Sequence, residues 1–185
     1  MTDTNGANEK DGLIGKMFLY EKPELLTRES HGSLGFTPAK KPFEFVKGVR
    51  AVPLTMIEIG SAQRHYPIIF SALENPIPLA VVGLVEQANL FVDDEGRWDA
   101  MCYVPTYLRC YPFTFAVQKG GQLAVVVDRN APSVSESPEY PFFVNGEISE
   151  HTDALMQLCA QYEGERKRTQ EYCRKLVELD LLTTL

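Results

Sequence analysis

The chain has 185 residues and a formal net charge of −7. This length favours one domain with an additional element, and the negative charge argues against nucleic-acid binding, which requires clustered Lys and Arg. An apolar content of 44% argues against wholesale disorder. No apolar stretch approaches the ~20 residues that are needed to cross a bilayer.

Residues 1–16 are polar and acidic and do not have the pattern of a secretory signal. We interpret them as a disordered tail ahead of a β-rich core over residues 17–147. We expect a cytoplasmic protein, with attachment to the cell surface by a dedicated export route as the alternative. The four cysteines form no Cys-x-x-Cys pair, which favours reduced thiols. We predict no metal site and no cofactor.

Five segments in the first half of the core have the apolar pattern of β-strands: residues 43–46, 54–59, 68–70, 79–85 and 89–92. The run 79–85 is continuously apolar, which is typical of a strand buried on both faces. Between the second and third segments, residues 60–65 are predicted to form one helical turn capped by Ser61. Residues 93–96 (Asp-Asp-Glu-Gly) predict a tight turn.

The second half of the core has a similar order of elements. Pro105 is expected to begin a short helix, followed by strands over residues 113–117 and 123–127. Residues 119–122 are expected to form their hairpin turn, because paired glycines accept the positive φ angles of short loops. Residues 128–139 predict a long exposed loop, and residues 140–144 a further strand.

A sequence motif occurs twice in this core. Arg64-x-Tyr66-Pro67-x-x-Phe70 matches Arg109-x-Tyr111-Pro112-x-x-Phe115, and a Leu-Ala-Val-Val run follows each motif, at 79–82 and at 123–126. Self-similarity of this kind predicts one supersecondary unit that is used twice. The alternative is that proline and aromatic residues mark strand starts independently.

The hydrophobic period changes after residue 147, and residues 148–185 predict a long helix capped by Ser149. The middle, residues 163–168, is polar on every side and contains Gly164, so the helix is expected either to bend there or to project beyond the core. The apolar end, residues 179–185, requires a cover. The predicted fold class is therefore α+β: a mainly antiparallel sheet or partly closed barrel built from two related helix–strand–hairpin units, plus a long C-terminal helix.

Five strings of residues carry a resemblance to a known family. They are Leu26-x-Arg28-Glu29-x-His31, Val52-Pro53-Leu54, Tyr66-Pro67-Ile68-Ile69-Phe70, Asn89-Leu90-Phe91-Val92-Asp93-x-x-Gly96-x-Trp98 and Tyr103-Val104-Pro105-x-Tyr107-x-Arg109-x-Tyr111-Pro112-Phe113. Together they resemble the SapC family of bacterial proteins, named for a surface-layer-associated protein, over residues 17–182. The resemblance implies a link to a surface layer and supplies no catalytic residue.

The chain departs from the family pattern at two places. Family members usually continue well beyond the helix, so this chain is expected to be either a short member or one trimmed at Leu185. Cys110 stands where relatives more often have a basic residue. If an Arg-Arg pair binds a ligand in those relatives, its binding would be weaker here.

Six residues are candidate ligand-binding residues: Arg64, Arg109, His31, His65, Trp98 and Tyr107. The two arginines hold equivalent places in the repeat, where they could together bind a carboxylate or phosphate, or could each satisfy backbone carbonyls locally. His31 follows Arg28-Glu29 and could act as a general base, or could tie the N-terminal segment to the sheet. The aromatic residues could line a pocket or stack on a sugar, or could be core residues.

Two functions of different classes are compatible with these residues. The first is a non-catalytic binding or assembly protein that contacts a protein partner, or itself, through an aromatic sheet face and the C-terminal helix. The alternative is an enzyme or small-ligand sensor with an anion-binding pocket between the two repeat units. No catalytic residues are predicted, because the chain has no Gly-x-Ser-x-Gly, no Gly-x-Gly-x-x-Gly and no His-Glu-x-x-His motif.

Overall fold

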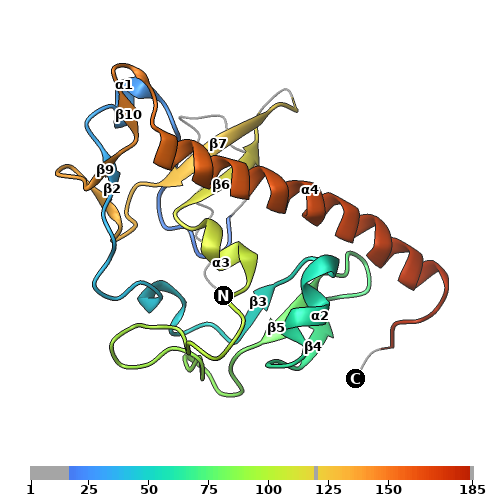
Figure 1. The fold of residues 1–185 in the computed structure, drawn as a ribbon. Coiled ribbons are helices and arrows are strands. Elements are labelled where there is room, and N and C mark those ends of the chain that lie inside the picture. Colours follow the sequence, from blue (N-terminus) through green and yellow to red (C-terminus); the bar gives the residue numbers. More distant parts are fainter. Residues whose placement is uncertain (1–16, 119–120, 184–185) are drawn as a thin grey trace, which may run out of the picture. The chain divides into compact units, whose positions relative to one another are not determined.

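The computed structural model describes residues 17–118 and 121–183 (Figure 1). The strands are β1 (Pro23–Leu25), β2 (Gly35–Phe36), β3 (Ala51–Pro53), β4 (Ile68–Phe70), β5 (Pro78–Val81), β6 (Phe113–Val117), β7 (Leu123–Asp128), β8 (Val134–Ser135), β9 (Tyr140–Pro141), β10 (Phe143–Val144) and β11 (Glu147–Ile148). The helices are α1 (Arg28–His31), α2 (Ile59–Ala62), α3 (Thr106–Cys110) and α4 (Glu150–Glu178), with 3₁₀ helices η1 (Glu44–Val46) and η2 (Met56–Glu58). The predicted disordered tail, residues 1–16, and part of the predicted hairpin turn, residues 119–120, lie outside the described residues.

The chain divides into two compact units. Unit 1 contains the residues up to Ala39 together with Tyr111–Cys159, and unit 2 contains Lys40–Cys110 together with the residues from Ala160 onward. The described elements include both helices and strands and a long C-terminal helix, so the predicted α+β class and that helix are confirmed. The single main sheet or partly closed barrel is wrong, because the described strands form small separate antiparallel sheets.

Unit 1 is built on the three-stranded sheet β1-β7-β6, which is antiparallel throughout. Its central strand β7 contributes the apolar residues Val126 and Val127, which are fully buried. Phe113 of β6 packs edge-to-face on Phe142, with ring centroids 5.2 Å apart. Burying each such side chain stabilises the fold by ~1.5–3 kcal/mol. Two smaller groups, β8-β2-β9 and β10-β11, complete the strands of this unit.

Unit 2 is built on the sheet β3-β5-β4, also antiparallel. Strand β5 alternates buried and partly exposed residues and ends at Val81, so the prediction of a doubly buried strand over residues 79–85 is wrong. After β5, the N–H groups of Val82 and Gly83 both donate to the Arg50 carbonyl oxygen, and this pairing stops the regular ladder.

Three other predicted strands are also wrong. Residues 44–46 form η1, and residues 56–62 form η2 and α2. In the latter segment Thr55 and Glu58 form a capping box, which starts a helix and overrides the strand-like alternation. This box lies ahead of Ser61, so the predicted cap at Ser61 is wrong. Residues 89–92 contain only a single bridge, between Val92 and Trp98.

Helix α4 begins after Ser149, whose Oγ accepts a hydrogen bond from the Thr152 N–H at 3.3 Å, so the predicted cap is confirmed. The helix is continuous through Gly164. In unit 1 the Cys159 Sγ donates to the Phe113 carbonyl oxygen at 3.5 Å, and in unit 2 the Thr169 Oγ1 accepts from the Met56 N–H at 2.9 Å. No helix among the described residues is long and apolar enough to span a membrane.

The two repeated motifs occupy comparable places in their own sheets. Each Tyr-Pro pair stands between a short helix, α2 or α3, and the first strand of an antiparallel pair. In both sheets the second strand of that pair is central and also pairs with an earlier strand, β3 or β1. The use of one supersecondary unit twice stays a prediction.

Candidate functional site

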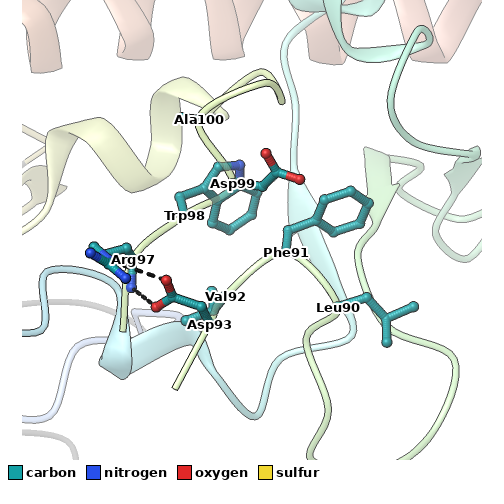
Figure 2. Close-up of a pocket in the computed structure, with 8 residues that line it drawn as sticks. All are labelled: Leu90, Phe91, Val92, Asp93, Arg97, Trp98, Asp99 and Ala100. Atoms are coloured by element: carbon teal, nitrogen blue, oxygen red, sulfur yellow. Dashed lines mark hydrogen bonds and ion pairs between the residues drawn. The ribbon is translucent and has the colours of Figure 1, made fainter. Parts of the chain in front are cut away.

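A pocket of ≈ 540 Å³ that is open to solvent, called the cavity below, lies in unit 2 (Figure 2). Its lining consists of Leu90, Phe91, Val92, Asp93, Arg97, Trp98, Asp99 and Ala100. These residues come from the two arms of one tight turn, over residues 93–96. The predicted turn is confirmed.

Backbone hydrogen bonds hold the two arms together. The Asp93 N–H donates to the Arg97 carbonyl oxygen at 3.0 Å, and the Asp99 N–H donates to the Phe91 carbonyl oxygen at 2.9 Å. Gly96 closes the turn at φ +68°, a conformation that costs a side-chain-bearing residue ~1–2 kcal/mol. The pairing brings Phe91 and Trp98 onto the same wall of the cavity.

The rings of Phe91 and Trp98 lie nearly parallel, with centroids 6.0 Å apart and 18° between their planes. Tyr66 meets Phe91 edge-on at 4.7 Å. The Trp98 Nε1–H donates to the Tyr66 hydroxyl at 3.2 Å, and that hydroxyl donates to the Tyr103 carbonyl oxygen. Burial raises the pKa of Tyr66 to about 12, so its hydroxyl keeps the proton for this bond. The aromatic wall is thus held in one orientation by hydrogen bonds.

The charged side chains of the cavity fall into two sets. Arg97 lies 3.0 Å from Asp93 and 3.0 Å from Glu95, and its own N–H also donates to Asp93 at 2.8 Å. This backbone bond, together with the guanidinium, lowers the pKa of Asp93. The Asp99 carboxylate accepts a hydrogen bond from the Met101 N–H at 2.9 Å and a second one from the Cys102 thiol, and it forms no ion pair with a described residue.

A family model describes this chain. The model of the SapC family matches residues 26–185, which is most of the chain. The chain belongs to the SapC family. No curated protein and no solved structure matches it.

The SapC-family chain distributes the six predicted ligand-binding residues over both units. Trp98 lines the cavity and is 7% exposed. His65 packs on Tyr66 at 5.9 Å, one ring away from Trp98. Tyr107 packs on Tyr162 at 5.8 Å, away from the cavity lining. Burial raises the pKa of Tyr107.

Neither predicted arginine lines the cavity. Arg109 donates to the Thr106 Oγ1 at 2.6 Å, and its guanidinium lies 5.9 Å from the Tyr103 ring centroid. Arg64 is exposed just after α2. The contacts of Arg109 are therefore local, but they are with a side-chain hydroxyl and a ring and not with backbone carbonyls. The shared anion site stays a prediction.

His31 belongs to unit 1 and is fully buried. Its Nδ1 accepts from the Thr27 N–H at 3.3 Å, while its Nε2 lies 3.3 Å from the Glu24 carboxylate, outside hydrogen-bond geometry. Burial lowers the pKa of His31, against the opposing effect of Glu24. These contacts tie α1 to β1, whereas Arg28 and Glu29 are exposed.

Sequence reasoning did not single out two buried carboxylates. Glu58 accepts four hydrogen bonds, from the Thr55 N–H and Oγ1, the Tyr103 hydroxyl and the Thr106 N–H, at 2.7–2.9 Å. Asp128 accepts four in unit 1. The Thr55-x-x-Glu58 spacing is a recognisable capping box, but no local pattern marks Asp128. Within the described residues, no three His, Cys, Asp or Glu side chains converge as metal ligands would.

Proposed function

We propose that this SapC-family chain is a non-catalytic binding protein and that the cavity of unit 2 is its binding site. The observation that carries the proposal is the composition of the cavity: an aromatic wall, Phe91 and Trp98, beside a few polar groups. Small-molecule sites in proteins have this composition and volumes of ~300–1,000 Å³. The ≈ 540 Å³ of this cavity falls within that range.

The buried ionisable groups support binding over catalysis. A general base must reach the proton it removes at ~3 Å or through one water. Glu58 and Asp128 have their lone pairs occupied by four protein donors each. His31 is sealed from solvent and uses Nδ1 for the Thr27 N–H. These groups stabilise the two units and are not free to remove a proton from a ligand.

A ligand screen read through Trp98 tests the proposal, because this is the only tryptophan of the chain. We expect saturable fluorescence changes with some small polar molecules, and loss of the change in Phe91→Leu. Ile57→Ser is the matched control, since Ile57 is 71% exposed in the same unit but does not line the cavity. Hits that survive Phe91→Leu and disappear in Ile57→Ser would show that the cavity is not the binding site.

Exposed apolar side chains favour assembly with a protein partner, or self-association, as a second function. Leu84 and Val85 are exposed in the irregular chain that follows β5 in unit 2, and Tyr172, Val177 and Leu179 are exposed on or just after α4. We expect a Leu84→Ser, Val85→Ser variant to weaken concentration-dependent association measured by sedimentation velocity. A wild-type chain that stays monomeric at high concentration, with no partner that depends on Leu84, would argue against this function.

The anion-binding alternative and the location have tests of their own. If Arg64 and Arg109 bind a carboxylate or phosphate, each Arg→Gln substitution should reduce that binding. A cytoplasmic location predicts recovery in the soluble cytoplasmic fraction of the native host, and surface attachment predicts recovery in the envelope fraction.

A further inference from the structure

We propose that the cavity of unit 2 takes a small organic cation, specifically a molecule that carries a methylated ammonium group. The inference rests on the proposed function and adds the chemical class of the ligand. Three features carry it: the aromatic wall, the unmatched Asp99 carboxylate and the apolar rim.

The aromatic wall offers the electron-rich faces that attract cations. A cation within ~6 Å of an aromatic centroid is attracted by the ring quadrupole, most strongly by Trp. Trp98 and Phe91 lie nearly parallel, and the bond from Trp98 Nε1 to the Tyr66 hydroxyl keeps the indole from turning. The wall is therefore formed before a ligand arrives, which reduces the entropy cost of binding.

The cavity has one carboxylate whose charge no described cation balances. Arg97 is engaged by Asp93 and Glu95 at 3.0 Å each, so its guanidinium is already paired. Asp99 follows Trp98 in the chain, and its backbone N–H is bonded to the Phe91 carbonyl oxygen. Figure 2 shows the Asp99 side chain near the two rings and the Asp93–Arg97 pair away from them. An ammonium group on the rings would therefore have an anion beside it.

The rim suits the apolar part of such a ligand. Leu90 lines the cavity and is 66% exposed. Methyl groups on nitrogen spread the positive charge over an apolar surface, which the Leu90 side chain can cover. An anionic ligand would instead meet Asp99, and a neutral polyol would make no use of its charge.

The test compares choline with its neutral carbon isostere, in which a tert-butyl group replaces the trimethylammonium group. Both are titrated into the full chain while Trp98 fluorescence is recorded, with calorimetry as a second readout. We expect choline to bind about 5- to 10-fold more tightly, since a cation–π contact with a nearby carboxylate contributes differences of this order.

Asp99→Asn removes the charge and keeps an oxygen that can accept from the Met101 N–H. We expect it to weaken choline binding about 5- to 10-fold and to leave the isostere unchanged. Phe91→Leu should weaken both ligands. Asp94→Asn is the matched control, because Asp94 belongs to the same turn, has a 98% exposed side chain and does not line the cavity. Unfolding curves establish that each variant is folded.

The outcomes separate the two proposals. Equal affinity for choline and its isostere, or an Asp99→Asn variant that retains the preference for choline, would overturn the cation assignment while leaving the cavity as a binding site. Tighter saturable binding of acetate or a methyl glycoside, lost in Phe91→Leu, would do the same. If neither cations, neutral molecules nor anions perturb Trp98 saturably, both proposals fail.

Discussion

Replacing Asp128 by alanine should destabilise unit 1 more than any surface substitution. This fully buried carboxylate accepts from the backbone N–H groups of Glu21 and Lys22 at 2.9 Å each, and of Asn130 at 3.1 Å. The Tyr111 hydroxyl donates a fourth bond at 3.1 Å. Asp128 thereby joins the segment before β1 to the end of β7 and to the repeated Tyr-Pro motif.

The magnitude follows from the donors that alanine would leave without an acceptor. A hydrogen bond to a charged group contributes ~1.5–3 kcal/mol, and a buried donor left unpaired costs ~1–3 kcal/mol. The three backbone donors are only partly buried, so water can reach some of them and the four terms do not add. We expect Asp128→Ala to lower the free energy of unfolding by about 3–5 kcal/mol. Tyr111→Phe, which removes one bond, should cost about 1 kcal/mol.

Urea denaturation followed by far-UV circular dichroism measures both variants, and Trp98 fluorescence reports unit 2 in the same samples. Because the chain has two compact units, the two probes need not share one transition. For Asp128→Ala we expect the urea midpoint measured by circular dichroism to fall at least as much as the midpoint measured by Trp98 fluorescence. A loss below about 1 kcal/mol, or one no larger than that of Tyr111→Phe, would refute the idea that Asp128 organises unit 1.

Three further predictions concern single positions. Burial lowers the pKa of His31 in the folded chain below its ordinary 6.5. As the pH falls below 6.5, the imidazole of the unfolded chain therefore takes up a proton before that of the folded chain does. The contribution of His31 to stability is therefore complete above pH 6.5 and decreases below it, and His31→Gln should flatten unfolding free energy against pH; an unchanged slope would contradict this. Ser149→Ala should cost about 1 kcal/mol in urea denaturation by removing the cap of α4, and a neutral result would exclude that cap. Gly96→Ala should lower Tm more than Gly121→Ala. Both glycines have a positive φ, but only at Gly96 would the new Cβ meet another residue, the Lys41 Cβ at 2.6 Å. Equal decreases in Tm would exclude a steric contribution from Lys41.

Family membership and several elements could be predicted from the sequence, because they depend on local patterns. The strings around Trp98 and Tyr107 indicated the SapC family, which the family model confirms over residues 26–185. Pro67 and Pro112 correctly marked the starts of β4 and β6, since proline is tolerated at the first position of a strand. Ser149 correctly marked the start of α4.

Other elements depended on contacts between distant residues. Alternating polarity over residues 54–59 matches a strand, yet Glu58 makes a capping box and also accepts from the Tyr103 hydroxyl, 45 positions away. Asp128 has no local signature, because two of its donors come from a segment more than 100 positions earlier. The cavity arises only when the turn at Gly96 brings Phe91 and Trp98 together.

The sequence by itself determined the turn at residues 93–96, the apolar segments and the family of this chain, because these properties are carried by neighbouring residues. The tertiary structure decided which carboxylates are buried and saturated with donors, and it left Asp99 beside an aromatic wall with no cation from the described residues paired to it. That difference follows from the burial and pairing of charges, which depend on groups that are brought together only by folding.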